Sequence, residues 1–368
     1  MARTYSAVEM TDAIKKVLAE TDPLRRQREF ATLLESLTAE NAEAAVLALQ
    51  EAPRSRWNWG QEYSLLTYAW GRIDGEAAVA YAKGLEGRTR EWTMASVLAG
   101  WANESPEQAQ AWVDGIEDAG ERRDFTRGLV YGLAQRDVDA ATAYVLGLPD
   151  SDGDRNREYI GSIARQQLSQ GVEAAAGWAE SLPEGSLKGS ALRTIADDYV
   201  RRNPEEAAAW VEQYAGSESG VSPISEVAEE WAERDPEAAL QWADSLPEGS
   251  SRNHALGESI SEWAREDPVA AGEYVAAMPD GTARDFAVSS YARRVVREDP
   301  DAAIQWAQSI DEEKIRNKTV ARTAREWMQR DATAANAWLQ SAQLPEPVVK
   351  EILAPRQDES WRRGRDRR

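Results

Sequence analysis

Carboxylates are the most concentrated reactive groups in this sequence. Between Asn203 and Ser250 the chain carries twelve Asp and Glu residues and one basic residue, Arg234. Such a surface can steer a basic partner by long-range attraction. It can equally serve only to keep a long surface from self-association. Both interpretations stay open, and the binding hypothesis has these candidate residues: Glu205, Glu206, Glu226, Glu229, Glu230 and Glu233.

The residue types needed for metal or nucleophilic chemistry are scarce. The chain has no cysteine and a single histidine, His254, at a predicted helix start, where a surface or capping role is the ordinary one. Asp150, Asp152 and Asp154 alternate like the first ligands of a calcium loop. Arg155 stands where that loop requires glycine, and no glutamate follows at the twelfth position. We predict no catalytic residue, no metal site and no cofactor.

The overall charge bears on the class of partner. The 368 residues include 43 Lys plus Arg and 64 Asp plus Glu, which gives a net charge of −21. This excess opposes the phosphates of nucleic acids and of anionic membranes, so we expect neither as a partner. No apolar run approaches the ~20 residues of a membrane span. The start lacks an apolar signal core, which favours the cytoplasm; an exported chain with its signal removed is the alternative.

A repeat of 32 residues organises the chain. Asp-Pro or Asn-Pro pairs begin at Asn203, Asp235, Asp267 and Asp299. One aromatic series follows these positions by seven residues and another precedes them by four. Together the two series contain eleven of the fifteen tryptophans: Trp70, Trp101, Trp112, Trp178, Trp210, Trp231, Trp242, Trp263, Trp306, Trp327 and Trp338. Self-similarity at this period is the signature of a repeat protein.

An unbroken column of alanines accompanies the aromatics. It stands three residues before each aromatic that follows the Asp, as Ala239 and Ala271 illustrate. A position that is always methyl-sized predicts a close approach of two helix backbones. The tryptophans share helical stripes with these alanines and are therefore predicted to fill the seam between helices. Trp57, Trp59 and Trp92 lie outside both series and are the candidates for a ligand-facing aromatic.

Each repeat is predicted to be two helices. Leu256, Ile260 and Trp263 mark the apolar stripe of the first helix, over residues 251–266. Asp267 then ends that helix and caps the second, and Pro268 supplies its first helical residue. We expect an all-α fold, a right-handed α-solenoid of antiparallel helix pairs. Residues 1–53 are expected to form an N-terminal helical cap, 54–344 about nine repeats, and 345–368 a cap remnant with a disordered Arg-rich tail.

In kind, the unit resembles the tetratricopeptide, Sel1 and HEAT families of helical repeats. The spacing of Ala238 and Trp242 is similar to that in the second helix of a tetratricopeptide unit. The period of 32 and the missing Leu-Gly-x-x-Tyr pattern are departures from it. The resemblance concerns architecture and implies a superhelix with a concave face, but it assigns no binding residue.

The function that we predict is a non-enzymatic scaffold that binds a protein or peptide on its concave face and acidic centre. If the acidic charge steers the partner, that partner is basic. One alternative is a helical-array enzyme acting on a glycan polymer, which would need a pair of carboxylates ~5–10 Å apart. Another is an acidic mimic of nucleic acid that blocks a basic protein.

Overall fold

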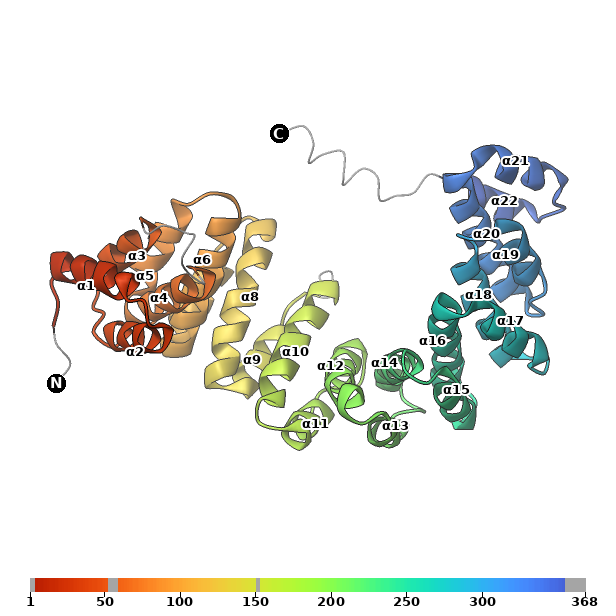
Figure 1. The fold of residues 1–368 in the computed structure, drawn as a ribbon, viewed down its shortest axis with the longest axis horizontal. Coiled ribbons are helices and arrows are strands. Elements are labelled where there is room, and N and C mark those ends of the chain that lie inside the picture. The colour runs from red at the N-terminus through yellow and green to blue at the C-terminus, as the bar shows by residue number, and fades with distance from the viewer. Residues whose placement is uncertain (1–3, 52–58, 150–152, 355–368) are drawn as a thin grey trace. The chain divides into compact units, whose positions relative to one another are not determined.

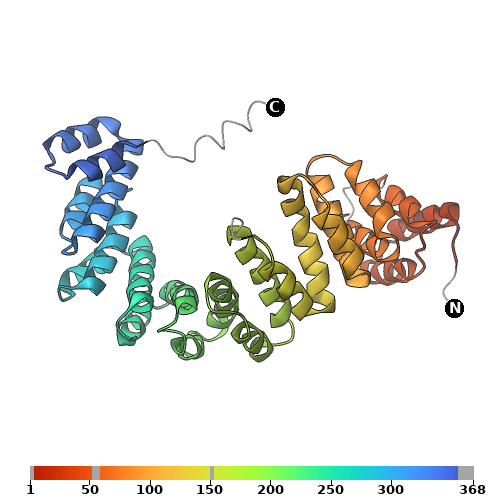
Figure 2. The same ribbon diagram turned by 180° about the vertical axis from the view of Figure 1, so that it is seen from behind.

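The computed structural model describes residues 4–51, 59–149 and 153–354, and every regular element in these ranges is a helix. The prediction of an all-α fold is thereby confirmed, and the sequential packing of the helices in pairs is that of an α-solenoid. The described chain divides into two compact units, residues 1–171 and 172–368. Figures 1 and 2 show the succession of helices from two opposite sides.

The first unit contains ten helices in its described ranges. Their bounds are α1 (Ala7–Ala19), α2 (Pro23–Leu34), α3 (Ala42–Gln50), α4 (Trp59–Ile73), α5 (Gly75–Lys83), α6 (Gly87–Glu104), α7 (Pro106–Asp114), α8 (Ala119–Arg136), α9 (Val138–Leu146) and α10 (Gly153–Leu168). The longer helices α4, α6, α8 and α10 pack side by side in one layer. Helices α5, α7 and α9 each pack back against the longer helix that precedes or follows them.

The second unit repeats this arrangement. Its elements are α11 (Val172–Glu180), α12 (Ser186–Arg202), α13 (Pro204–Glu212), the 3-10 turn η3 (Glu218–Gly220), α14 (Val221–Ala232), α15 (Pro236–Ser245), α16 (Ser250–Glu266), α17 (Pro268–Ala277), α18 (Thr282–Val295), α19 (Pro300–Gln308), α20 (Glu313–Arg330), α21 (Ala332–Ser341) and α22 (Glu346–Leu353). Helices α12, α14, α16, α18 and α20 lie side by side and form the first-helix layer of this unit.

Side-chain caps set the corner inside seven hairpins, whereas Ser105, before α7, makes no such hydrogen bond. The residue before the second helix accepts a hydrogen bond from a backbone N–H of that helix's first turn, which satisfies a donor that the helix cannot pair. For example, Asp267 accepts from the N–H of Ala270 at 3.0 Å. The same cap recurs at Asp74, Asp137, Asn203, Asp235, Asp299 and Asp331.

Paired aromatic rings fill the space between the two helices of a hairpin. Ring centroids are 5.1–6.2 Å apart in seven hairpins, within the range of favourable aromatic contact. Trp231 on α14 and Trp242 on α15 are one such pair, at 5.9 Å. Where Val295 replaces the aromatic, Tyr291 supplies the ring from one turn earlier and lies 5.1 Å from Trp306.

The alanine column is buried, as expected for a methyl-sized position between helices. Its members have no solvent exposure: Ala45, Ala78, Ala109, Ala141, Ala175, Ala207, Ala239, Ala271, Ala303 and Ala335. Glycines also allow helices of the first unit to approach closely, which the periodicity did not predict. A Cβ at Gly71 would lie 2.2 Å from the Val97 oxygen, and one at Gly100 would lie 2.0 Å from the Tyr68 oxygen. Helices α4 and α6 therefore touch backbone to backbone.

Candidate functional site

Carboxylates of two adjacent helices of the second unit, α14 and α16, lie near one another. Glu226, Glu229 and Glu230 project from α14, and Glu258 and Glu262 project one turn apart from α16. We call these five residues the acidic surface. One stripe of α14, which includes Ile224, Val227, Ala228 and Trp231, is buried in the core. On its other side Glu229 is exposed and Glu230 is half-buried, whereas Glu226 is buried beside Arg193 of α12.

Desolvation raises the pKa of three carboxylates of the acidic surface, Glu226, Glu229 and Glu262. Burial raises the pKa of Glu226, although its ion pair with Arg193 of α12 opposes the shift. Although Glu229 is exposed, neighbouring protein atoms remove part of its hydration and raise its pKa, and the negative charges of Glu226, Glu258 and Glu262 raise it further. Such a cluster gains stability when a cation approaches it.

Two carboxylates of the acidic surface have no cation of their own. Glu229 is exposed and Glu258 is half-buried, and neither forms an ion pair with any residue that the structure describes. Glu226, Glu230 and Glu262, by contrast, pair with Arg193, Arg201 and Arg265 respectively. The free charge of the surface is therefore centred on Glu229 and Glu258.

A subset of these residues has the spacing of a cation site. Asp197 of α12, Glu226 and Glu230 each offer an oxygen within 4.8 Å of the others. Arg193 and Arg201 form ion pairs with all three carboxylates, so two cations face three anions. Among the described residues of the second unit, these three groups have the spacing to hold a metal ion, and we assign none to them.

The remaining sequence candidates are distributed over different faces. Glu205 and Glu206 lie in the first turn of α13, where Glu206 accepts a hydrogen bond from the Tyr199 hydroxyl at 3.3 Å. Glu233 is exposed just after α14, with its carboxylate 3.5 Å from Arg265. The structure thus brings the α14 glutamates together with Glu258 and Glu262, two residues that the sequence analysis missed. Glu205 and Glu206 lie apart from them, in the layer formed by the second helices of the hairpins, which we call the second-helix layer. The four-residue spacing of Glu258 and Glu262 was the available signal.

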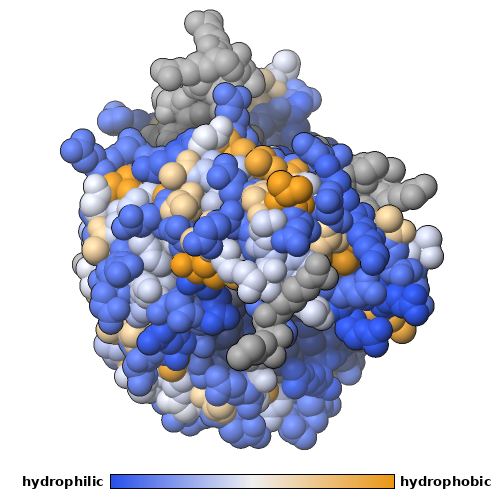
Figure 3. Space-filling model, turned by 90° about the vertical axis from the view of Figure 1, so that its left-hand side faces the viewer, coloured by the Kyte–Doolittle hydropathy of each residue, from blue (hydrophilic) through white to orange (hydrophobic). Residues whose placement is uncertain are grey.

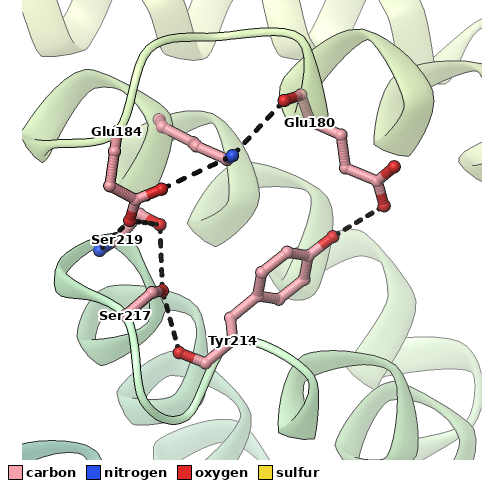
Figure 4. A network of polar contacts seen from close by, with 6 residues as sticks. Glu180, Glu184, Tyr214, Ser217 and Ser219 are labelled. Carbon is pink, nitrogen blue, oxygen red and sulfur yellow. Dashed lines mark hydrogen bonds and ion pairs between the residues drawn. The ribbon is translucent and has the colours of Figure 1, made fainter.

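A polar network fixes the loop that leads into α14 (Figure 4). The Tyr214 hydroxyl donates to Glu180 at 2.9 Å, and burial together with this carboxylate raises the pKa of the Tyr214 hydroxyl. The backbone N–H of Ser219 donates to Glu184 at 3.0 Å, and the Ser219 hydroxyl donates to the same oxygen. These bonds join the loop before α12 to the loop before α14, so they set the register of α14 against α12.

The first unit has a groove of different chemistry. It encloses about 850 Å³ along the face of α4, α6, α8 and α10. Hydroxyl and amide groups line it; for example, the Tyr68 hydroxyl donates to Gln135 at 2.7 Å. Glu158 is the carboxylate among its lining residues, and it is ion-paired with Arg127. The groove therefore offers hydrogen bonds and aromatic surface, but not the pair of carboxylates that glycoside hydrolysis requires.

Trp92, one of the aromatic candidates outside the repeat series, does not line this groove. Trp92 lies on α6 and is 59% exposed. Trp59 begins α4, and its side chain lies outside the described part of the structure, as do Trp57 and all of the Arg-rich tail beyond Ala354. Of the alternating aspartates, Asp154 belongs to α10 and pairs with Arg157, whereas Asp150 and Asp152 are outside the described residues.

The exposed surface is mainly hydrophilic on the face shown in Figure 3, where hydrophobic residues form small separate groups. Among the described helices, none is both long enough and apolar enough to cross a membrane.

The chain is thus a helical-repeat protein of the α-solenoid class, with an acidic surface on one unit and a groove lined by hydroxyl, amide and aromatic groups on the other. Comparisons with protein-family models, with curated proteins and with solved structures give no match for it.

Proposed function

We propose that this protein is a non-enzymatic scaffold that binds basic segments of a protein or peptide on the first-helix layer of its second unit. The observation that carries the proposal is the free negative charge at Glu229 and Glu258, which lies beside three further carboxylates on adjacent helices. An Arg or Lys side chain placed between α14 and α16 would relieve the repulsion that raises the pKa of Glu229.

The architecture supports this proposal in a second way. The hairpins hold their shape through buried aromatic pairs and caps, so the outward positions of the first helices are free for recognition. Successive first helices present equivalent positions in a row, which suits an extended ligand better than a compact one. We further propose that the repeat is a divergent relative of the tetratricopeptide-like class, because the small residue and the aromatic keep their spacing on the second helix.

Calorimetric titration with a defined basic peptide, Arg-Gly-Ser-Arg-Gly-Ser-Arg, tests the proposal. The double variant Glu229→Gln/Glu258→Gln should bind this peptide about fivefold more weakly, since two exposed ion pairs contribute about 1 kcal/mol together. The matched control Glu205→Gln/Glu237→Gln makes the same change of net charge on the second-helix layer and should bind as the parent does. Equal losses in both double variants would mean that overall charge, and not this surface, attracts the peptide.

A further inference from the structure

A cavity of about 580 Å³ lies beside the acidic surface, between α16, α18 and α20. Its lining includes Arg293 of α18 and, at four-residue intervals along α20, Lys314, Lys318 and Arg322. The interval of four places the three α20 side chains on one face of the helix. An acidic protein thus concentrates four cations in one hollow.

These four cations have no carboxylate of their own. None of them forms an ion pair or a side-chain hydrogen bond with any residue in the described ranges. Other arginines of the same layer are paired, as Arg193 is with Glu226 and Arg297 with Glu326. Glu312, at the edge of the cavity, is engaged as the cap of α20, where it accepts from the N–H groups of Lys314 and Ile315.

The cavity wall adds a flat surface beside the cations. His254 and Phe286 lie with their ring centroids 5.7 Å apart. The Nδ1 atom of His254 is 2.8 Å from the carbonyl oxygen of Ser250, so the neutral ring donates there from Nδ1 and its Nε2 is an acceptor. The Ser289 and Thr319 hydroxyls bond to each other, and Thr319 also donates to the carbonyl oxygen of Ile315. The donors that match the acceptor oxygens of carboxylates are therefore the four cations.

The acidic surface and the cavity are continuous, because Glu258 belongs to both. A nucleic acid in the cavity would have to continue its phosphate backbone past Glu258, Glu229 and Glu262, where repulsion opposes it. A peptide can instead change sign along its length. We propose that the first-helix layer of the second unit recognises a bipolar peptide segment, with basic residues on the acidic surface and acidic residues in the cavity; this inference rests on the proposed function.

The spacing of the two halves follows from helix packing. Neighbouring helices pack about 8–10 Å apart, so the midpoint between α14 and α16 lies roughly 14 Å from α18 at the centre of the cavity. An extended chain advances about 3.3–3.6 Å per residue. The segment therefore needs about four residues between its basic part and its acidic part.

Three labelled peptides test the proposal on the full chain by fluorescence anisotropy. The first is the basic peptide used above, followed by a Gly-Ser-Gly-Ser spacer and three Glu; the second has the same composition in the opposite chain direction. The third replaces the three Glu of the first by Gln. We expect at least one bipolar peptide to bind about tenfold more tightly than the Gln peptide, as expected for two or three exposed ion pairs.

Variants of the cavity separate this inference from the proposed function. Lys318→Gln/Arg322→Gln should abolish the tenfold gain and leave the affinity for the Gln peptide unchanged. The control Arg330→Gln/Lys350→Gln, with the same change of net charge outside the cavity, should keep the gain. Equal binding of bipolar and Gln peptides to the parent chain would overturn the bipolar inference alone. Failure of the Gln peptide to respond to Glu229→Gln/Glu258→Gln would instead overturn the proposed function.

Discussion

Replacement of Gly71 by alanine tests the backbone contact between α4 and α6. Alanine normally stabilises a helix relative to glycine by up to ~1 kcal/mol. At Gly71, however, the new Cβ would lie 2.2 Å from the Val97 oxygen, which is about 1.2 Å inside ordinary contact distance. The neighbour is backbone and cannot rotate away, so α6 has to move. We expect overpacking to outweigh the helix preference and to destabilise the first unit by about 2 kcal/mol.

The control for Gly71→Ala lies in the same helix. Gly60 is exposed, and a Cβ there would meet nothing within 4 Å, so Gly60→Ala should be neutral or slightly stabilising. Urea unfolding followed by tryptophan fluorescence gives the two free energies of unfolding. Hydrogen exchange of peptides from α4 and α6 locates the loss in the first unit. A Gly71→Ala protein as stable as the Gly60→Ala protein would refute the proposed contact.

Three further expectations concern the repeat and the acidic surface. Ala335→Leu should lower the free energy of unfolding by about 1–3 kcal/mol in urea melts, whereas Ala337→Leu, on the exposed side of α21, should change it little. Asp267→Ala should cost about 1 kcal/mol in the same assay, because the N–H of Ala270 loses its acceptor. Affinity for the basic peptide should fall as pH is lowered from 7: a Glu with a raised pKa takes up its proton above the ordinary value of 4.5 and then stops attracting cations. A titration curve that is flat until pH 4.5 would contradict this.

The pH dependence of stability follows from the same pKa shifts, with a definite sign. The pKa values of Glu226, Glu229 and Glu262 are higher in the folded chain than the ordinary 4.5, so the folded state holds these protons more tightly than the unfolded state. The free energy of unfolding therefore falls as pH rises from the ordinary pKa of 4.5 through the raised pKa values, and it recovers on acidification. Bound basic ligand should reduce this fall, because it favours the ionised form.

The helices of this fold could be predicted from the sequence because the residues that end and cap each helix are neighbours along the chain. Asp267-Pro268 determines both a helix end and a cap through neighbouring atoms, and Trp231 and Trp242 meet because each lies at a fixed place in its own helix. The contact of Gly71 with Val97 could not be predicted in this way, since it depends on how two helices approach in space. The periodicity likewise does not reveal that the chain divides after Gly171.

The candidate site was predicted only in part, for a related reason. Counting charges along residues 203–250 grouped Glu205 with Glu229, although the hairpin turns their helices into different layers. The same window excluded Glu258, which the next repeat brings beside Glu229. Residues that lie side by side on adjacent repeats of this solenoid are about 32 positions apart in the sequence. A charge count over fewer than two repeats therefore includes only part of each surface. The cations of α20 were missed because the charge count covered residues 203–250, although residues 314–325 contain no Asp or Glu.

Photo-crosslinking with the basic peptide is the most direct test of whether basic segments bind on α14 and α16. A photoreactive group in the middle of Arg-Gly-Ser-Arg-Gly-Ser-Arg, irradiated with the full chain and analysed by mass spectrometry, reports which helices the peptide contacts. The account predicts adducts on α14 and α16 that decrease in Glu229→Gln/Glu258→Gln. Adducts concentrated on α13 and α15, or spread evenly over acidic segments of both units, would contradict it.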